Sequence, residues 1–138
     1  MTKFKLYKSS GFAETEGWKD WTPVFTCEGT MEFDPVTIHF ARYRQIGKAI
    51  EFQMSAKGTI VAPVSNIIKF TLPVAPIGRS GGNLIAFSAY IYDNNTVKAG
   101  AAFFISTGPN VRVYIYDNSN YTAGTNREIN VTGRYEIA

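Results

Sequence analysis

Apolar and polar residues alternate along most of this chain, as they do in strands that bury one face. The clearest case is residues 50–57, where Ile50, Phe52, Met54 and Ala56 fall on one side. A period of two residues is typical of a half-buried strand, whereas apolar positions in a helix recur every three or four residues. No segment shows a sustained helical period, so the sequence predicts an all-β domain.

The strand at 50–57 is expected to pair with the segment before it through a tight turn at Gly47-Lys48. Glycine at the first turn position suits the two-residue hairpin turn called type II′. The resulting register pairs Arg44 with Glu51 as an ion pair on the solvent-facing side of the hairpin. It pairs Tyr43 with Phe52 as an aromatic pair on the buried side. Before the hairpin the apolar phase reverses, which predicts a bulge or bend near Phe40 or Ala41.

Further alternating segments of strand length follow, separated by turn-forming residues. The expected strands are 67–72, 84–92, 96–106, 111–115 and 127–137. Within 96–106 the alternation places five apolar residues on one face: Val97, Ala99, Ala101, Phe103 and Ile105. About eight short strands of this kind pack as two sheets or close as a barrel. We expect an antiparallel two-sheet sandwich, jelly-roll-like, with a short N-terminal arm.

The first 22 residues differ from the rest, because they are rich in charge and show no sustained period. We interpret residues 1–22 as an N-terminal arm or attachment segment, with Trp18 and Trp21 as anchors against the domain. Residues 23–138 form the β-sandwich domain, and a chain of 138 residues has the usual size of one domain.

Composition narrows the chemistry that the chain can perform. Cys27 and His39 are the only cysteine and the only histidine, so the three or four ligands of a zinc site cannot be assembled from them. No nucleophile-elbow motif is present, and the glycine-rich stretch 78–82 lacks the ending of a phosphate loop. We therefore expect no enzymatic activity, no cofactor and no metal site.

Charge and hydropathy limit the partners in the same way. The formal net charge is +3, and the basic residues are scattered rather than clustered on one element. The N-terminus carries no apolar signal-peptide stretch, and no apolar run approaches the length of a membrane helix. We expect neither nucleic-acid binding nor membrane insertion, and synthesis in the cytoplasm of the host.

Polar turns are the first candidate contact surface. Residues in loops are often those that bind, because a rigid scaffold positions them. The candidates for contact with a host or ligand are Asp93, Asn94, Asn95, Asp117, Asn118, Asn120 and Tyr121. The same oxygen-rich turns are also explained by local Asx turns.

A repeated tyrosine pattern is the second candidate surface. Tyr90-Ile91-Tyr92-Asp93-Asn94 recurs as Tyr114-Ile115-Tyr116-Asp117-Asn118, which places four tyrosines on one face of neighbouring strands. Tyrosine is common at protein interfaces and offers sugars a flat face. A subunit interface formed by Tyr90, Tyr92, Tyr114 and Tyr116 is one interpretation; cross-strand packing and ligand contact are the others.

Short motifs in a fixed order give the chain a family resemblance. They are Trp21-Thr22-Pro23, then Tyr43 to Gly47 before a strand, then Leu72-Pro73, and finally Gly133-Arg134-Tyr135. In this order residues 21–138 resemble the β-rich C-terminal domain of bacteriophage tail-fibre and minor virion structural proteins. The chain departs from the family at 27–30, where only a trace remains of its glycine-rich segment.

The resemblance implies a virion structural protein of the tail-fibre or receptor-binding type, non-enzymatic and homotrimeric. Such a protein would associate with itself and with other virion proteins, and its loops would contact a host-surface glycan or protein. Its place would be the virion. The alternative is a stand-alone carbohydrate-binding module of the lectin type, which the tyrosines and the Asp/Asn turns would serve equally well. The acidic residues permit a hydrolase, but no motif favours one.

Overall fold

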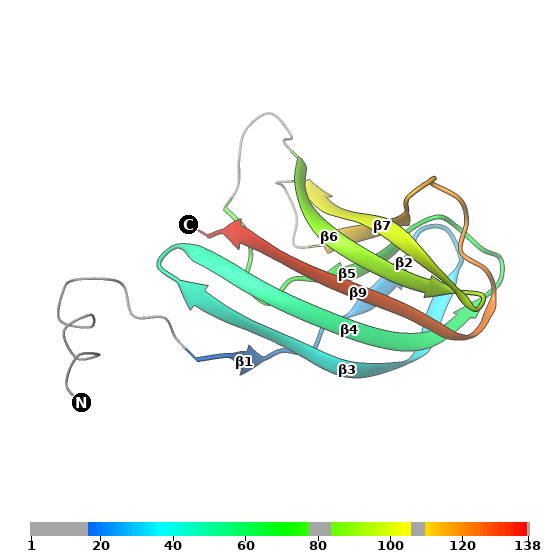
Figure 1. The fold of residues 1–138 in the computed structure, drawn as a ribbon, viewed down its shortest axis with the longest axis horizontal. Coiled ribbons are helices and arrows are strands. Elements are labelled where there is room, and N and C mark those ends of the chain that lie inside the picture. Colours follow the sequence, from blue (N-terminus) through cyan, green and yellow to red (C-terminus); the bar gives the residue numbers. More distant parts are fainter. Residues whose placement is uncertain (1–16, 78–83, 106–109, 138) are drawn as a thin grey trace.

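The computed structural model describes residues 17–77, 84–105 and 110–137, and these residues contain strands and no helix. In chain order the strands are β1 (Lys19–Asp20), β2 (Phe25–Cys27), β3 (Glu32–Ile46), β4 (Ala49–Val61), β5 (Ile68–Thr71), β6 (Leu84–Asp93), β7 (Thr96–Ile105), β8 (Asn110–Ile115) and β9 (Gly124–Glu136). Within this part of the chain they form one antiparallel sheet in the order β1-β3-β4-β9-β6-β7-β8-β5-β2 (Figure 1). The all-β, antiparallel prediction is confirmed.

The sheet curls until its two halves face each other, so one hydrogen-bonded sheet supplies both layers of a sandwich. Phe25 of β2 and Phe33 of β3 come from opposite ends of the strand order, yet their ring centroids are 5.5 Å apart. Trp21 spans the same gap: its backbone N–H donates to the Ala41 carbonyl (3.0 Å), and its indole N–H donates to the Thr71 carbonyl (3.1 Å). The predicted sandwich is present, with its layers joined by continuous pairing.

Phe52 of β4 lies at the centre of the core and is 1% exposed. Its ring lies edge-on against Trp21, Phe87 and Tyr135, and also against Phe70 in the facing layer, at centroid distances of 4.9–6.3 Å. Edge-to-face contacts add to the free energy gained by burying the rings themselves. This aromatic cluster is what holds the two layers together.

The predicted hairpin and its register are confirmed. Arg44 pairs with Glu51, and Tyr43 pairs with Phe52. The ion pair closes at 3.1 Å, and Gly47 has a φ of +60°, as the first position of the turn requires.

The predicted bulge in β3 is also present. The register with β4 shifts between Ile38 and Phe40, which makes His39 the extra residue. The shift reverses the phase of the strand, so that Phe40 is 46% exposed and Ala41 is buried.

The sequence placed Val97, Ala99 and Ala101 on one face of β7 without indicating which face is buried, and the structure turns this face outward. Val97 is 58% exposed and Ala99 and Ala101 are exposed, whereas Ala102 and Phe104 are buried. Both faces of this strand are apolar, so alternation could not decide which one turns inward. In the structure the pairing with β6 sets the inner face, where Ala102 lies opposite the bulky, buried Phe87.

The remaining boundaries differ from the expected ones by a few residues. β5 is shorter than the predicted strand 67–72, and β9 begins before 127. Residues 1–16 of the predicted arm, the loop at 78–83 and the turn at 106–109 lie outside the described residues.

Gly133 tests the packing of the core. A Cβ at this position would fall onto the ring of Phe87, which itself packs on Phe52. We expect Gly133→Ala to lower the free energy of unfolding by about 3 kcal/mol, the upper end of the usual cost of overpacking, as measured by denaturant titration. Gly17→Ala is the matched control, because a Cβ there meets nothing within 4 Å, and it should change stability by less than about 0.5 kcal/mol. Equal stability of the two variants would contradict this packing.

Candidate functional site

Four connections gather at one end of the sandwich, on the right in Figure 1: β2–β3, β4–β5, β6–β7 and β8–β9. We call them the loop end. The β3–β4 hairpin and the end of β9 lie at the opposite end. Hydrogen bonds join the loops to one another: Asn66 Nδ2 donates to Asn118 Oδ1 (2.7 Å), and the Tyr121 N–H donates to the Ser65 carbonyl (3.0 Å). The Ser65 N–H in turn donates to Met31 Sδ in the β2–β3 connection (3.2 Å), so three of the four connections form one linked surface.

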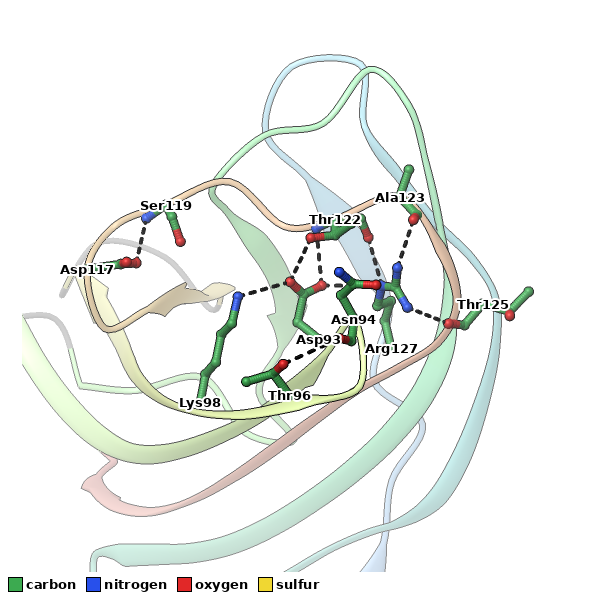
Figure 2. Close-up of polar contacts among 10 residues, drawn as sticks. All are labelled: Asp93, Asn94, Thr96, Lys98, Asp117, Ser119, Thr122, Ala123, Thr125 and Arg127. Atoms are coloured by element: carbon green, nitrogen blue, oxygen red, sulfur yellow. Dashed lines mark hydrogen bonds and ion pairs between the residues drawn. The ribbon is translucent and has the colours of Figure 1, made fainter.

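A buried carboxylate organises this end. Asp93, the last residue of β6, is 0% exposed. Arg127 Nε lies 3.2 Å and Lys98 Nζ 3.4 Å from its oxygens, and Thr122 donates both its N–H (3.1 Å) and its hydroxyl (3.0 Å), as Figure 2 shows. A buried charge is tolerated only when it is paired and fully hydrogen-bonded, as this one is.

The guanidinium of Arg127 also fixes the backbone that enters β9. It donates to the carbonyls of Thr122 (2.8 Å), Ala123 (2.8 Å) and Thr125 (2.7 Å). The guanidinium carries five donors in a rigid fork, which suits such a set of acceptors. Gly124 runs beside it with a φ of +137°, where a side chain would meet the guanidinium.

Two of the predicted contact residues belong to this framework. Asp93 is buried, and Tyr121 is 2% exposed with its hydroxyl donating to the Val113 carbonyl (2.8 Å). Burial raises the pKa of the Tyr121 phenol above its usual range. Both side chains help to shape the loops, and neither is exposed at the surface of the loop end.

The other predicted contact residues are exposed: Asn94, Asn95, Asp117, Asn118 and Asn120. Asn94 and Asn95 have φ values of +50° and +60°, which makes the β6–β7 connection a type I′ turn. The Asp117 carboxylate accepts the N–H of Ser119 (3.0 Å), and hydrogen bonding to Ser119 holds the pKa of Asp117 below its ordinary value. Their contact with a partner stays a prediction.

The four predicted tyrosines do share the outer face of β6, β7 and β8. Tyr90 lies opposite Ala99, and the backbone N–H of Tyr116 donates to the Ala99 carbonyl, which places the three residues in one row. Tyr90 is 44% and Tyr116 69% exposed, while Tyr92 and Tyr114 are half-buried. β7 contributes Val97, Ala99 and Ala101 to this face, which the sequence did not indicate. We call this surface the tyrosine face.

The comparison with solved structures finds the same architecture elsewhere. The C-terminal receptor-binding domain of the avian reovirus fibre sigmaC matches with a TM-score of 0.58 and 14% identity, over 90% of this chain and 78% of that one. This chain shares the fold of that domain. A second structure of avian reovirus sigmaC, in a C2 crystal form, matches with a TM-score of 0.55 and 15% identity, over 90% of this chain and 63% of that one. No protein-family model matches the sequence, and no curated protein matches it.

The side chains named for chemistry lie apart from one another. His39 is exposed in the β3 bulge. Partial burial raises the pKa of the Cys27 thiol to about 11, which keeps it protonated at neutral pH. Among the described residues no three His, Cys, Asp or Glu side chains gather as metal ligands, and no helix is long and apolar enough to cross a membrane.

Sequence reasoning missed the Asp93–Arg127 pair, because its partners come from different strands and no local motif marks either residue as buried. We expect Arg127→Met to lower the free energy of unfolding by about 3–5 kcal/mol, since it leaves the Asp93 carboxylate buried without its main partner. Denaturant titration measures this change. Arg44→Met is the control: it removes an ion pair with Glu51 that is about one-third exposed and a surface contact with the Trp18 ring, which together should contribute about 1 kcal/mol. Similar losses in the two variants would contradict the framework role of Arg127.

Proposed function

We propose that this chain is the receptor-binding head of a virion fibre, non-enzymatic, and of the bacteriophage tail-fibre type that its motif order resembles. The observation that carries the proposal is the fold likeness to a fibre receptor-binding domain over 90% of the chain. The arrangement of the loops supports it, because the strand that follows the N-terminal segment is remote from the loop end (Figure 1). One end can then join the particle while the other meets the host.

Residues 1–22 would form the attachment arm and residues 23–138 the head. The described part of the arm, residues 17–22, is docked on the head. β1 pairs with β3, and the Trp18 ring packs against the guanidinium groups of Arg42 and Arg44, 4.9 and 4.8 Å from its centroid. Cation–π contacts of this kind would fix the arm where it meets the head.

The tyrosine face would join three copies of the chain. It sets exposed aromatic residues around the small side chains of Ala99 and Ala101, so another surface can approach closely. Tyrosine is enriched at protein interfaces, and monomers seldom expose contiguous apolar patches of this kind. Three copies rather than two follow from the family resemblance.

A charge placed on the tyrosine face should separate the copies. We expect light scattering after size exclusion to give three times the chain mass of 15.3 kDa for the native protein and 15.3 kDa for Ala99→Lys, since a lysine at the centre of an interface would be desolvated. Ala75→Lys, another exposed alanine off this face, should keep the native mass. A native mass of one chain would contradict the trimer and favour the stand-alone lectin.

The exposed loop asparagines should contribute to adsorption. Glycine adopts positive φ readily, so Asn94→Gly, Asn95→Gly and Asn118→Gly together remove three amides while keeping their turns. We expect the triple variant to bind bacterial cells at least about tenfold more weakly than the native protein, because interface polar groups lose their partners. Flow cytometry of labelled protein on a panel of strains measures this, with solution mass and unfolding midpoint as controls. Undiminished adsorption would exclude these loops as the contact surface.

A further inference from the structure

A groove of about 450 Å³ lies on the outer face of β3, β4 and β9, on a different part of the surface from the tyrosine face. Its lining includes the side chains of Thr37, His39, Lys57, Thr59, Thr125 and Asn126. None of these residues belongs to the predicted contact loops. The groove is thus a separate feature of the same molecule.

The groove forms where the strand pairing is interrupted. The β3–β4 register shifts between Phe33 and Val36 and again between Ile38 and Phe40, and the β4–β9 register shifts between Gly58 and Ile60. Five residues in these gaps line the groove: Pro35, His39, Thr59, Thr125 and Asn126. Bulges re-aim side chains and are common beside binding sites. Three interruptions around one hollow indicate a built site rather than a chance depression.

Glycine at position 58 permits this shape. A Cβ there would lie 2.7 Å from the Pro35 carbonyl oxygen, so only glycine allows β3 to approach so closely. On the other side Asn126 has a φ of +59°, a left-handed conformation in the backbone that leads into Arg127. The Arg127 guanidinium holds the Thr125 carbonyl at 2.7 Å, so the buried network at the loop end also fixes this wall.

The charge of the groove is positive. Lys57 makes no ion pair within the described part of the chain, and none of the lining residues is acidic. Glu128 lies opposite Lys57 on the neighbouring strand β9. Its carboxylate accepts a hydrogen bond from Asn130 Nδ2 (3.5 Å) and does not line the groove. The other polar side chains offer three hydroxyls, an imidazole and an amide. A cation beside several neutral hydrogen-bonding groups matches a polyol that carries one carboxylate.

We propose that this groove binds the acidic sugar of a surface glycan, with the carboxylate at Lys57 and His39 and the sugar hydroxyls at the threonines and Asn126. The inference rests on the proposed host-contact function and names its ligand class. The glycan would then be bound beside the loop end by residues of β3, β4 and β9. The search for polar turns in the sequence did not select these residues.

Calorimetry with trigalacturonic acid and with its fully methyl-esterified form tests the carboxylate, because esterification removes the negative charges and leaves the ring hydroxyls in place. We expect the acid to bind the full-length protein at least about tenfold more tightly than the ester, and Lys57→Met to abolish that difference. Thr37→Val should weaken binding of both forms, since it removes a hydroxyl and keeps the shape of the side chain. Lys48→Met, in the hairpin at the opposite end, is the matched control and should bind like the native protein.

Equal binding of acid and ester, or an unchanged Lys57→Met variant of native stability, would overturn the proposal. Displacement of the saccharide by an equal concentration of sulfate would also overturn it, because the groove would then be a simple anion patch. Cell adsorption separates this failure from failure of the host-contact function. If cells adsorb the protein while the saccharides do not bind, the groove proposal alone fails; if the saccharides bind and no cell adsorbs the protein, the fibre-head function fails.

Discussion

The fold depends on one constraint: a single sheet has to bend until strands from its opposite ends meet around Phe52. Burial of the aromatic cluster supplies the free energy that stabilises the closed sheet. The absence of a side chain at Gly133 leaves space for the Phe87 ring within that cluster. Closure also protects the edges of the sheet. The edge strands β1 and β2 are only two and three residues long, and very short edge strands are one way in which proteins limit pairing with another chain.

Bending has a second consequence on the outer surface. A sheet that curves this strongly cannot keep a regular ladder along strands as long as β3 and β4, so the pairing is interrupted. The bulge at His39 corrects the phase of the inner face, because it turns Ala41 into the core after Ile38. The same bulge carries His39 out to the groove. One backbone irregularity thus serves the core and shapes a surface that offers hydrogen-bonding groups.

The sequence was informative wherever the determining contacts were local. The β3–β4 hairpin followed from Gly47 and from complementary pairs a few residues apart. The face of β7 did not follow, since both of its sides are apolar and only the pairing with β6 distinguishes them. Loop polarity was equally ambiguous: Asp93 and Asn94 are adjacent in a polar turn, yet one is buried and the other exposed. The difference comes from Arg127, which lies far along the chain on the neighbouring strand β9 and which no local pattern identifies.

The proposed surfaces are compatible because they occupy different parts of the curled sheet. Association through β6, β7 and β8 would leave both the loop end and the groove on β3, β4 and β9 open to solvent. A contact between one groove and one sugar buries little area, and such contacts are usually weak. When several copies are linked, the first contact raises the effective concentration for the next, which can strengthen overall binding about 10²–10⁴-fold. A trimeric head can therefore bind a glycan-covered surface firmly even though each groove binds its sugar weakly. In such a trimer the tyrosine face would strengthen host contact without touching the host itself.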